Sequence, residues 1–288
     1  MVVVVLLWGA NFSFMRFALE EMSGLAFAGL RFTLAGVILL AILRWREGSI
    51  GAPRAAWGTL LWMGVLSNTL YQVFFMYGLT HTSVANASLI VATTPLIVAF
   101  LGAATGVEPL RRPVVLGGLL GFAGVVLILA GKGAALGVGR LNGDAAVLLA
   151  VLCWAGFTLG VRALRVPIST LRLTTYTMVT GAPGLLLLGL PGMLALDWAG
   201  LSARAWSGVA YSTLLAIVVA YLLWNNGVRV VGSGRTAIFN SMIPLVAMLV
   251  AWPLLGEAPK PVQIGGAALI VSGVLLSRRQ PAARVAEA

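Results

Sequence analysis

Long apolar runs, separated by short gaps that hold Gly, Pro or charged residues, follow one another along almost the whole chain. The runs lack strict alternation of apolar and polar residues, and most reach the roughly 20 residues that a helix needs to cross a bilayer. Helices also satisfy their own backbone hydrogen bonds in lipid. The pattern therefore predicts an all-α integral membrane protein. Ten transmembrane helices are predicted, at residues 2–19, 25–43, 57–78, 84–105, 113–130, 144–163, 169–190, 205–225, 234–255 and 261–277.

The composition agrees with a membrane protein, because 60% of the 288 residues are apolar and only 9% are charged. Soluble domains carry roughly 25% charged residues. The net charge of +11 does not predict nucleic-acid binding, since the charges lie in short gaps and form no basic face. Cys153 lies inside an apolar run and is interpreted as a small core residue. We see no cleavable signal peptide, and the run that starts at Val2 leaves open whether residues precede it.

Two segments, 80–108 and 232–257, share one pattern. Each begins with small and polar residues, carries a proline near its middle and ends in Gly and Glu. Pro95 of the first aligns with Pro244 of the second at an offset of 149 residues. A pattern that appears twice indicates an internal duplication, and duplicated apolar segments with a central proline are typical of transporters built from two repeats.

Trp8 and Trp154 align as well, at an offset of 146 residues. Each half then holds five spans, an odd number, so the halves insert in opposite directions and form two inverted five-helix repeats. The predicted domains are a first repeat at 1–132, an outer connecting loop at 133–142, a second repeat at 143–277 and a basic cytoplasmic tail at 278–288.

Basic residues are distributed unequally between the two sides of the predicted bundle. With ten spans both termini lie on one side, and 13 of the 19 basic residues fall in the loops and tail of that side. The other side holds Lys132, Arg140, Arg204 and Lys260. Cytoplasmic loops carry an excess of Lys and Arg, so both termini are predicted to be cytoplasmic.

Four stretches resemble one family of membrane proteins. LWGANFSFMRFAL (7–19) and LRFTLAGVILL (30–40) are similar to the first two helices of the EamA family, in the drug/metabolite transporter (DMT) superfamily. Residues 144–164 resemble the start of its second repeat, and 221–257 resemble its most distinctive segment. The resemblance implies ten helices around a central cavity and export of small metabolites or drugs across the bacterial inner membrane.

Span three carries polar and aromatic residues on one helix face, at spacings of three and four residues: Asn68, Tyr71, Gln72, Phe75 and Leu79. Amide groups are costly against lipid, so this face is expected to point at protein or at a wet cavity. An aromatic, partly polar surface suits a ligand, and we predict that the first four bind substrate. Interhelical hydrogen bonding is the alternative interpretation.

Trp8 and Trp154 occupy equivalent places in the two repeats, and Trp154 lies too deep in its span to be an interface anchor. We predict that both bind substrate, with a packed core tryptophan as the alternative for Trp154. Asn11, one turn from Trp8, and Asn240, one turn before Pro244, are further substrate-binding candidates.

Two prolines and two titratable residues are candidates for the transport cycle. Pro95 and Pro244 each remove a helix hydrogen bond, which predicts a fixed kink or a bend that gates its repeat. His81 and Glu20, near the outer ends of their spans, are the candidate proton or pH sites. No carboxylate or histidine is predicted at the middle of a span, which favours a facilitator or exchanger over an obligatory proton antiporter.

Arg31 falls about 9 Å into span two at 1.5 Å per residue. This places it within reach of Glu20 and Glu21, and we expect an ion pair with one of them. Glu20 also forms an i, i+4 pair with Arg16. Contact with a substrate carboxylate is the alternative for Arg31.

The sequence holds no Cys/His metal cluster, phosphate-binding loop or nucleophile–base pair, so no cofactor, metal or enzymatic activity is predicted. The main hypothesis is a secondary or facilitative exporter of aromatic and apolar amino acids. The alternative is a broad drug or metabolite exporter without aromatic preference. The expected partners are a small-molecule substrate and the lipid bilayer, not nucleic acid. The glycines of spans five and ten predict close helix packing, within a monomer or in a homodimer: Gly117, Gly121, Gly124, Gly265, Gly266 and Gly273.

Overall fold

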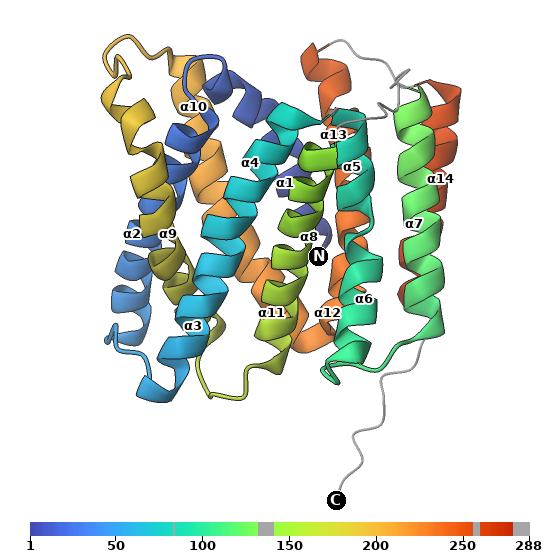
Figure 1. Ribbon diagram of the computed structural model, residues 1–288, viewed down its shortest axis with the longest axis horizontal. Helices are drawn as coiled ribbons and strands as arrows, with labels where there is room; N and C mark the ends of the chain where they lie inside the picture. Colours follow the sequence, from blue (N-terminus) through green and yellow to red (C-terminus); the bar gives the residue numbers. More distant parts are fainter. Residues whose placement is uncertain (83, 132–140, 256–259, 279–288) are drawn as a thin grey trace, which may run out of the picture.

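The computed structural model describes residues 1–82, 84–131, 141–255 and 260–278, and this part of the chain is helical. Successive long helices run in alternating directions through one bundle (Figure 1). The first half comprises α1 (Val2–Leu19), α2 (Gly24–Glu47), η1 (Arg54–Ala56), α3 (Trp57–Gly64), η2 (Val65–Leu70), α4 (Tyr71–His81), α5 (Val84–Ala92), α6 (Thr94–Ala104) and α7 (Arg112–Gly131). The second half comprises α8 (Leu141–Ala163), α9 (Thr170–Leu194), α10 (Ala203–Tyr211), η3 (Ser212–Val219), α11 (Ala220–Val231), α12 (Ser233–Ala237), η4 (Ile238–Met242), α13 (Ile243–Leu255) and α14 (Pro261–Arg278).

Length and hydropathy identify seven helices of the described chain that could cross a membrane, or eight if the bent pair Asn86–Ala92 and Thr94–Ala104 counts as one span. The predicted span at 57–78 is helical from Trp57 to His81 but carries polar residues in its middle. The predicted last span is α14, a shorter apolar helix. The arrangement of ten helices as two inverted sets of five therefore stays a prediction. Most of the predicted connecting loop and tail, with Lys132, Arg140 and Glu257, lies outside the described residues.

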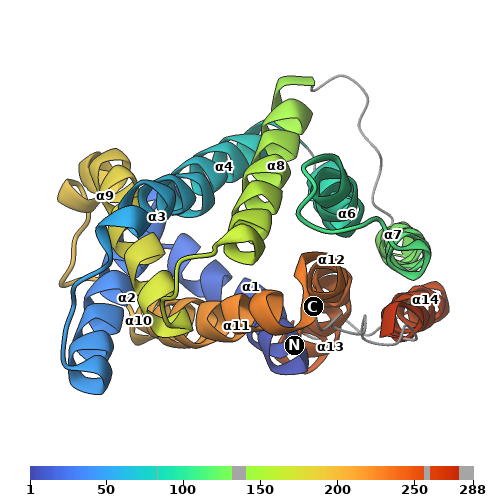
Figure 2. The same cartoon turned by 90° about the horizontal axis from the view of Figure 1, so that it is seen from below.

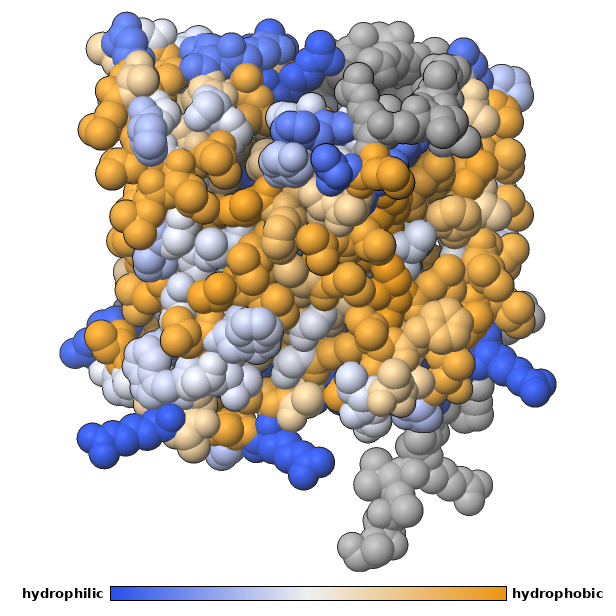
Figure 3. Space-filling model, in the orientation of Figure 1, coloured by the Kyte–Doolittle hydropathy of each residue, from blue (hydrophilic) through white to orange (hydrophobic). Residues whose placement is uncertain are grey.

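Large apolar side chains are exposed along the sides of the bundle. Figure 3 shows an apolar belt between two more hydrophilic ends on the face that it displays. Val37, Leu187 and Ile264 are 60%, 70% and 60% exposed. A soluble protein rarely exposes so continuous an apolar surface, whereas a bilayer covers it without cost. Four tryptophans near helix ends are exposed, as expected of interface anchors: Trp45, Trp57, Trp198 and Trp206.

Helices α7 and α14, from equivalent places in the two halves, pack with their backbones in contact (Figures 1 and 2). A Cβ atom on Gly117 would lie 2.5 Å from the carbonyl oxygen of Gly273, and one on Gly273 would lie 2.5 Å from that of Gly117. The same reciprocal 2.5 Å approach joins Gly124 and Gly266. Of the two interpretations left open for these glycines, the structure shows packing within one chain.

Two π-helical segments interrupt helices at corresponding places in the two halves. Segments η2 and η3 begin at Val65 and Ser212, which are 147 residues apart. This offset lies between the 146 and 149 residues that separate the aligned tryptophans and prolines. A π segment widens the helix and often occurs near functional sites, so both mark places where the backbone departs from regular packing.

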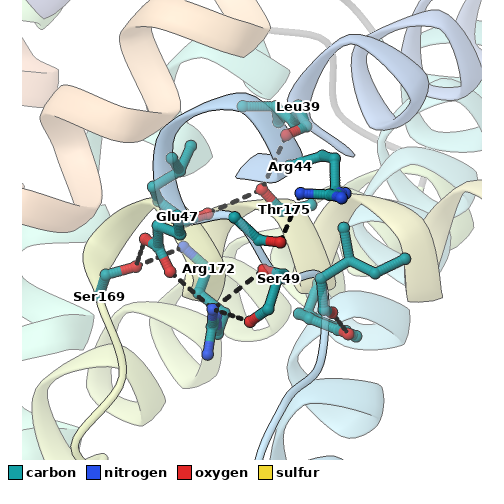
Figure 4. Close-up of polar contacts among 11 residues, drawn as sticks. Leu39, Arg44, Glu47, Ser49, Ser169, Arg172 and Thr175 are labelled. Carbon is teal, nitrogen blue, oxygen red and sulfur yellow. Dashed lines mark hydrogen bonds and ion pairs between the residues drawn. The ribbon is translucent and has the colours of Figure 1, made fainter. Parts of the chain in front are cut away.

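A polar network joins the two halves where α2 ends and α9 begins (Figure 4). The guanidinium of Arg172 lies 2.8 Å from the carboxylate of Glu47 and donates to the carbonyl and hydroxyl oxygens of Ser49. The hydroxyl of Ser169 donates to the same carboxylate. Ser169 also caps α9 by accepting from the backbone N–H of Arg172 at 2.9 Å, so that one network orders the loop and the helix end.

Glu108 makes a second link between the halves. Its carboxylate lies 2.9 Å from the guanidinium of Arg162. It also accepts hydrogen bonds from the backbone N–H groups of Ser233 and Gly234, at the N-terminus of α12. A carboxylate at a helix N-terminus is stabilised by the free N–H groups and the helix dipole.

At the opposite end of the bundle, two further contacts between the halves also involve carboxylates. Ser202 donates to Glu21 through its hydroxyl and its backbone N–H, and these hydrogen bonds hold the pKa of Glu21 below its usual range. Asp144 accepts from the hydroxyl of Thr82 and, at 3.3 Å, from the amide of Asn86. The two halves are therefore connected by polar contacts at both ends of the bundle.

The glycine contact between α7 and α14 predicts a sharp difference between two neighbouring positions. Gly266→Ala is expected to lower the free energy of unfolding by about 1–3 kcal/mol, because the new methyl group meets a backbone carbonyl. A Cβ atom on Gly265 would have no neighbour within 4 Å among the described residues. Gly265→Ala should therefore leave the free energy of unfolding unchanged or raise it by up to about 1 kcal/mol. Thermal unfolding of the purified variants measures both, and equal stability would contradict this packing.

Candidate functional site

Seven aromatic side chains meet inside the bundle and are called here the central aromatic cluster. They come from α1, α4, α8 and α11: Trp8, Tyr71, Phe75, Trp154, Phe157, Tyr221 and Trp224. The Trp154 ring is central, and the centroids of five other rings lie 5.4–5.7 Å from its own. Aromatic rings at such distances attract one another beyond simple burial.

Helical spacing brings the cluster together. Trp154 and Phe157 are three residues apart on α8, as are Tyr221 and Trp224 on α11, so each pair shares a helix face. The rings of Trp154 and Tyr221 meet edge to face at 87°. These four side chains are buried. They form the buried part of the central aromatic cluster.

The other three rings of the cluster are only half-buried. Tyr71 and Phe75 are one turn apart and stack at 5.6 Å with an interplanar angle of 9°. The indole N–H of Trp8 donates to the carbonyl of Ala216, in the π-helical segment η3, at 2.8 Å. The structure thus brings four predicted residues together, namely Trp8, Tyr71, Phe75 and Trp154.

The two amides of span three have different surroundings. The Asn68 Nδ2 donates to the backbone carbonyl of Thr177 on α9 at 2.7 Å, which is the interhelical bond given above as the alternative. Gln72 is buried, and its Oε1 has no hydrogen-bond partner among the described residues. The Asn68 Oδ1 lacks one as well, but the Asn68 Nδ2 already holds that side chain on α9, so Gln72 is the better candidate for a ligand contact.

Asn11 and Asn240 occupy two separate places. The Asn11 Oδ1 accepts from the hydroxyl of Ser212 at 2.6 Å, at the start of η3. Asn240 is half-buried in η4, the 3₁₀ segment that precedes α13. Their role in substrate binding stays a prediction.

Both prolines lie where a helix is interrupted. Pro95 is in the first turn of α6, and the helices on the two sides of this break are bent by 40°. The carbonyl of Val91, which Pro95 cannot serve, accepts from the hydroxyl of Thr94 at 2.5 Å. Pro244 follows η4 at the start of α13. At each break, the carbonyl that the proline leaves without its helical partner accepts another hydrogen bond.

The two candidate proton sites lie at the surface. His81 is exposed, stacks on Tyr77 and has its Nδ1 2.8 Å from the Tyr77 carbonyl. Glu20 is exposed and lies 3.6 Å from Arg16. His81 stacks on Tyr77 and Glu20 pairs with Arg16, neither of which belongs to the cluster, and a role in proton transfer stays a prediction for both.

The prediction that Arg31 forms an ion pair with Glu20 or Glu21 is wrong. Glu20 pairs with Arg16 and Glu21 is bound by Ser202, so neither carboxylate reaches Arg31. The Arg31 side chain instead turns inward and is only 5% exposed. The spacing along the sequence showed that both carboxylates were within reach of Arg31. It did not show that Arg16 and Ser202 bind them instead.

Tyr221 and Trp224 are cluster residues that the sequence prediction missed. Both belong to the stretch YLLWNNGVRVV, where the spacing of three places them on one face. Trp224 is fully buried, and its indole N–H has no hydrogen-bond partner in the part of the chain that the structure describes. That spacing was the only sign in the sequence that the two rings share a helix face. The pattern is weaker than that of span three because the residues between the two rings are apolar.

These features define a class. An all-helical bundle with an apolar surface and an internal aromatic cluster is a multi-pass membrane protein. The described residues include no group of three or more His, Cys, Asp or Glu arranged to hold a metal ion.

Comparison with known proteins gives the family. The sequence pattern of the EamA-like transporter family matches this chain twice, over residues 1–130 and 141–279, so the protein belongs to that family. It is 30% identical over 274 residues to the uncharacterized transporter YyaM of Bacillus subtilis, a match that covers 93% of this chain and 88% of that protein.

Two further similarities extend over the chain. It is 28% identical over 295 residues to a probable terminal-alkyne amino-acid exporter of Streptantibioticus cattleyicolor, covering 100% of this chain and 95% of the relative. A solved crystal structure superposes with a TM-score of 0.81 at 21% identity, covering 96% of this chain and 94% of the other. That structure supports the fold alone.

The contrast between Asn68 and Gln72 predicts opposite effects on stability. Asn68→Leu should lower the free energy of unfolding by about 1–3 kcal/mol, because it removes a buried interhelical hydrogen bond. Gln72→Met keeps the shape and removes an unpaired amide oxygen, so stability should be unchanged or higher. Thermal unfolding in detergent measures both. A large loss of stability in Gln72→Met would show that Gln72 is a structural residue.

Proposed function

We propose that this protein exports aromatic and other apolar amino acids, with related amphipathic metabolites, across the bacterial inner membrane. The central aromatic cluster carries the proposal, because its half-buried rings at Trp8, Tyr71 and Phe75 offer faces on which a substrate ring can stack. Membership of a transporter family and similarity to a probable amino-acid exporter support it. So does the resemblance of the sequence to the bacterial aromatic amino acid exporter YddG.

Alternating access is the proposed mechanism, with ten helices in two inverted halves and both termini in the cytoplasm. The Glu47–Arg172 and Glu108–Arg162 pairs link the halves at one end, and the Glu21 and Asp144 links join them at the other. Each half must release its links at one end while it keeps those at the other. The breaks at Pro95 and Pro244 are the proposed bends. An impermeant thiol reagent that labels a cysteine at residue 110 on intact cells would refute this orientation.

The second candidate function is export of drugs and metabolites without aromatic preference. The half-buried rings of Trp8, Tyr71 and Phe75 can also bury the apolar parts of other amphipathic compounds, and the family name specifies no substrate. Direct competition between phenylalanine and an unrelated amphipathic cation discriminates the two. Equal inhibition by the cation would favour the broader function.

Tyr71→Ala and Trp154→Ala should slow efflux of phenylalanine and tryptophan more than efflux of alanine. Each lost ring contact contributes about 0.5–1.5 kcal/mol, which corresponds to roughly a 2–10-fold loss. The measurement is initial efflux of labelled amino acids from liposomes. Tyr77→Ala, on the same helix as Tyr71 but exposed and stacked on His81, is the matched control.

The variants must insert and purify as the parent protein does. If both variants move aromatic substrates at the parent's rate, the cluster is a packing element and the substrate site lies elsewhere. If efflux of every amino acid falls equally, the rings support the fold or the cycle and do not recognise an aromatic substrate.

Transport is expected to proceed without obligatory proton coupling. Each described carboxylate lies at a helix end or in a loop, and His81 is exposed, so a central proton carrier is absent from the described residues. Efflux from liposomes is measured with and without an imposed pH gradient at equal substrate load. Accumulation of substrate above its equilibrium level would refute the expectation, and its loss in His81→Gln or Glu20→Gln would identify the missing site.

A further inference from the structure

Arg31 is a buried charge without a counter-ion among the residues that the structure describes. It lies seven residues into α2, about 10 Å along the helix axis, and is 5% exposed. The six carboxylates of the described chain all have other partners: Glu20 with Arg16, Glu21 with Ser202, Glu47 with Arg172, Glu108 with Arg162, Asp144 with Thr82 and Asp197 with the backbone of Ala199. A buried charge normally has a hydrogen-bonded partner, so this exception needs a physical explanation.

The contacts of Arg31 only partly compensate its charge. Its guanidinium carbon lies 4.8 Å from the ring centroid of Phe27 and 5.2 Å from that of Phe32, which gives two cation–π contacts. One terminal nitrogen lies 3.7 Å from the sulfur of Met15, a weak acceptor, and the Nε–H has no partner. A guanidinium has five N–H donors, and in the described chain none of them reaches an oxygen acceptor.

Arg31 borders the central aromatic cluster. The ring of Phe32, which packs under the guanidinium, lies 6.4 Å from the ring of Tyr221 in edge-to-face contact. A fixed positive charge with free donors therefore lies beside the rings that would hold an aromatic substrate.

We propose that Arg31 binds the carboxylate of the transported molecule while the molecule's ring lies on the central aromatic cluster. The inference rests on the proposed export of aromatic amino acids and adds the recognition element for their shared acid group. A guanidinium and a carboxylate match as a bidentate pair, and the low dielectric of the bundle strengthens their attraction. The bound acid supplies the counter-charge that the described part of the chain does not provide.

This assignment defines the substrate class as aromatic or apolar carboxylates. The carboxylate is then required for tight binding, whereas an amine that lacks it meets the fixed positive charge of Arg31 and is repelled. A purely structural Arg31, held by the rings of Phe27 and Phe32, would affect all substrates alike. Selectivity for the acid group, and not overall activity, separates the two roles.

The experiment compares three labelled probes in liposomes: L-phenylalanine, 3-phenylpropionate, which lacks the amine, and phenethylamine, which lacks the carboxylate. KM and initial efflux rate are measured for the parent protein, Arg31→Gln, Arg31→Lys and the control Arg16→Gln. Arg16 is an exposed arginine on α1 that is paired with Glu20. Each variant is first checked for insertion and monodispersity.

Arg31→Gln is expected to raise KM for both carboxylates by at least about tenfold, since it removes a charge-assisted hydrogen bond. KM for phenethylamine should be unchanged or lower. Arg31→Lys keeps the charge and loses the fork, so its effect on the carboxylates should be smaller. Arg16→Gln should change all three by less than about twofold.

Equal changes for all three probes in Arg31→Gln, or no change, would overturn the assignment. If that variant does not fold, two results still decide: the parent's preference for 3-phenylpropionate over phenethylamine, and the reduction of this preference in Arg31→Lys. A parent that moves both equally refutes the role of Arg31 even if it exports phenylalanine. A parent that moves 3-phenylpropionate but no amino acid refutes the proposed amino-acid export and leaves the Arg31 site standing.

Discussion

A polar group inside a membrane protein must find its partner within the protein, because lipid offers no hydrogen bonds. Much of this structure follows from that constraint. Asn68 bonds to the backbone of α9, the Asn225 amide donates to the Thr174 hydroxyl at 2.8 Å, and the Thr94 hydroxyl serves the carbonyl that Pro95 leaves free. Each satisfied group ties two helices together or keeps an interrupted helix intact.

The groups that lack partners are the more informative ones for function. Among the buried polar atoms that have no partner within the described chain are the Nε of Arg31, the Oε1 of Gln72 and the indole N–H of Trp224. Each would cost stability of about 1–3 kcal/mol if it stayed unpaired throughout the transport cycle. All three residues lie on helices that supply the aromatic cluster or the guanidinium beside it. A ligand with a carboxylate and polar hydrogens would satisfy groups that helix packing alone leaves open.

The apolar pattern predicted the helical bundle well, because long apolar runs in lipid permit little else. It also predicted that Tyr71 and Trp154 lie together, since one came from a polar helix face and the other from an unexplained deep position. It could not predict the choice of partner at Arg31, because Ser202 takes Glu21 from 181 residues away. It also missed Tyr221, whose contact with Trp8 depends on how α11 packs across α1.

The π-helical segments lie beside the central aromatic cluster in both halves of the chain. Segment η2 leads directly into Tyr71, and η3 provides the carbonyl that holds the indole of Trp8. Segment η3 also ends just before Tyr221, so each half of the chain has a ring of the cluster directly after a widened turn. Single-turn π segments of this kind are frequent at functional sites. Tyr71 and Tyr221 therefore lie where their helices depart from regular α-geometry, so a change in that geometry would move these two rings.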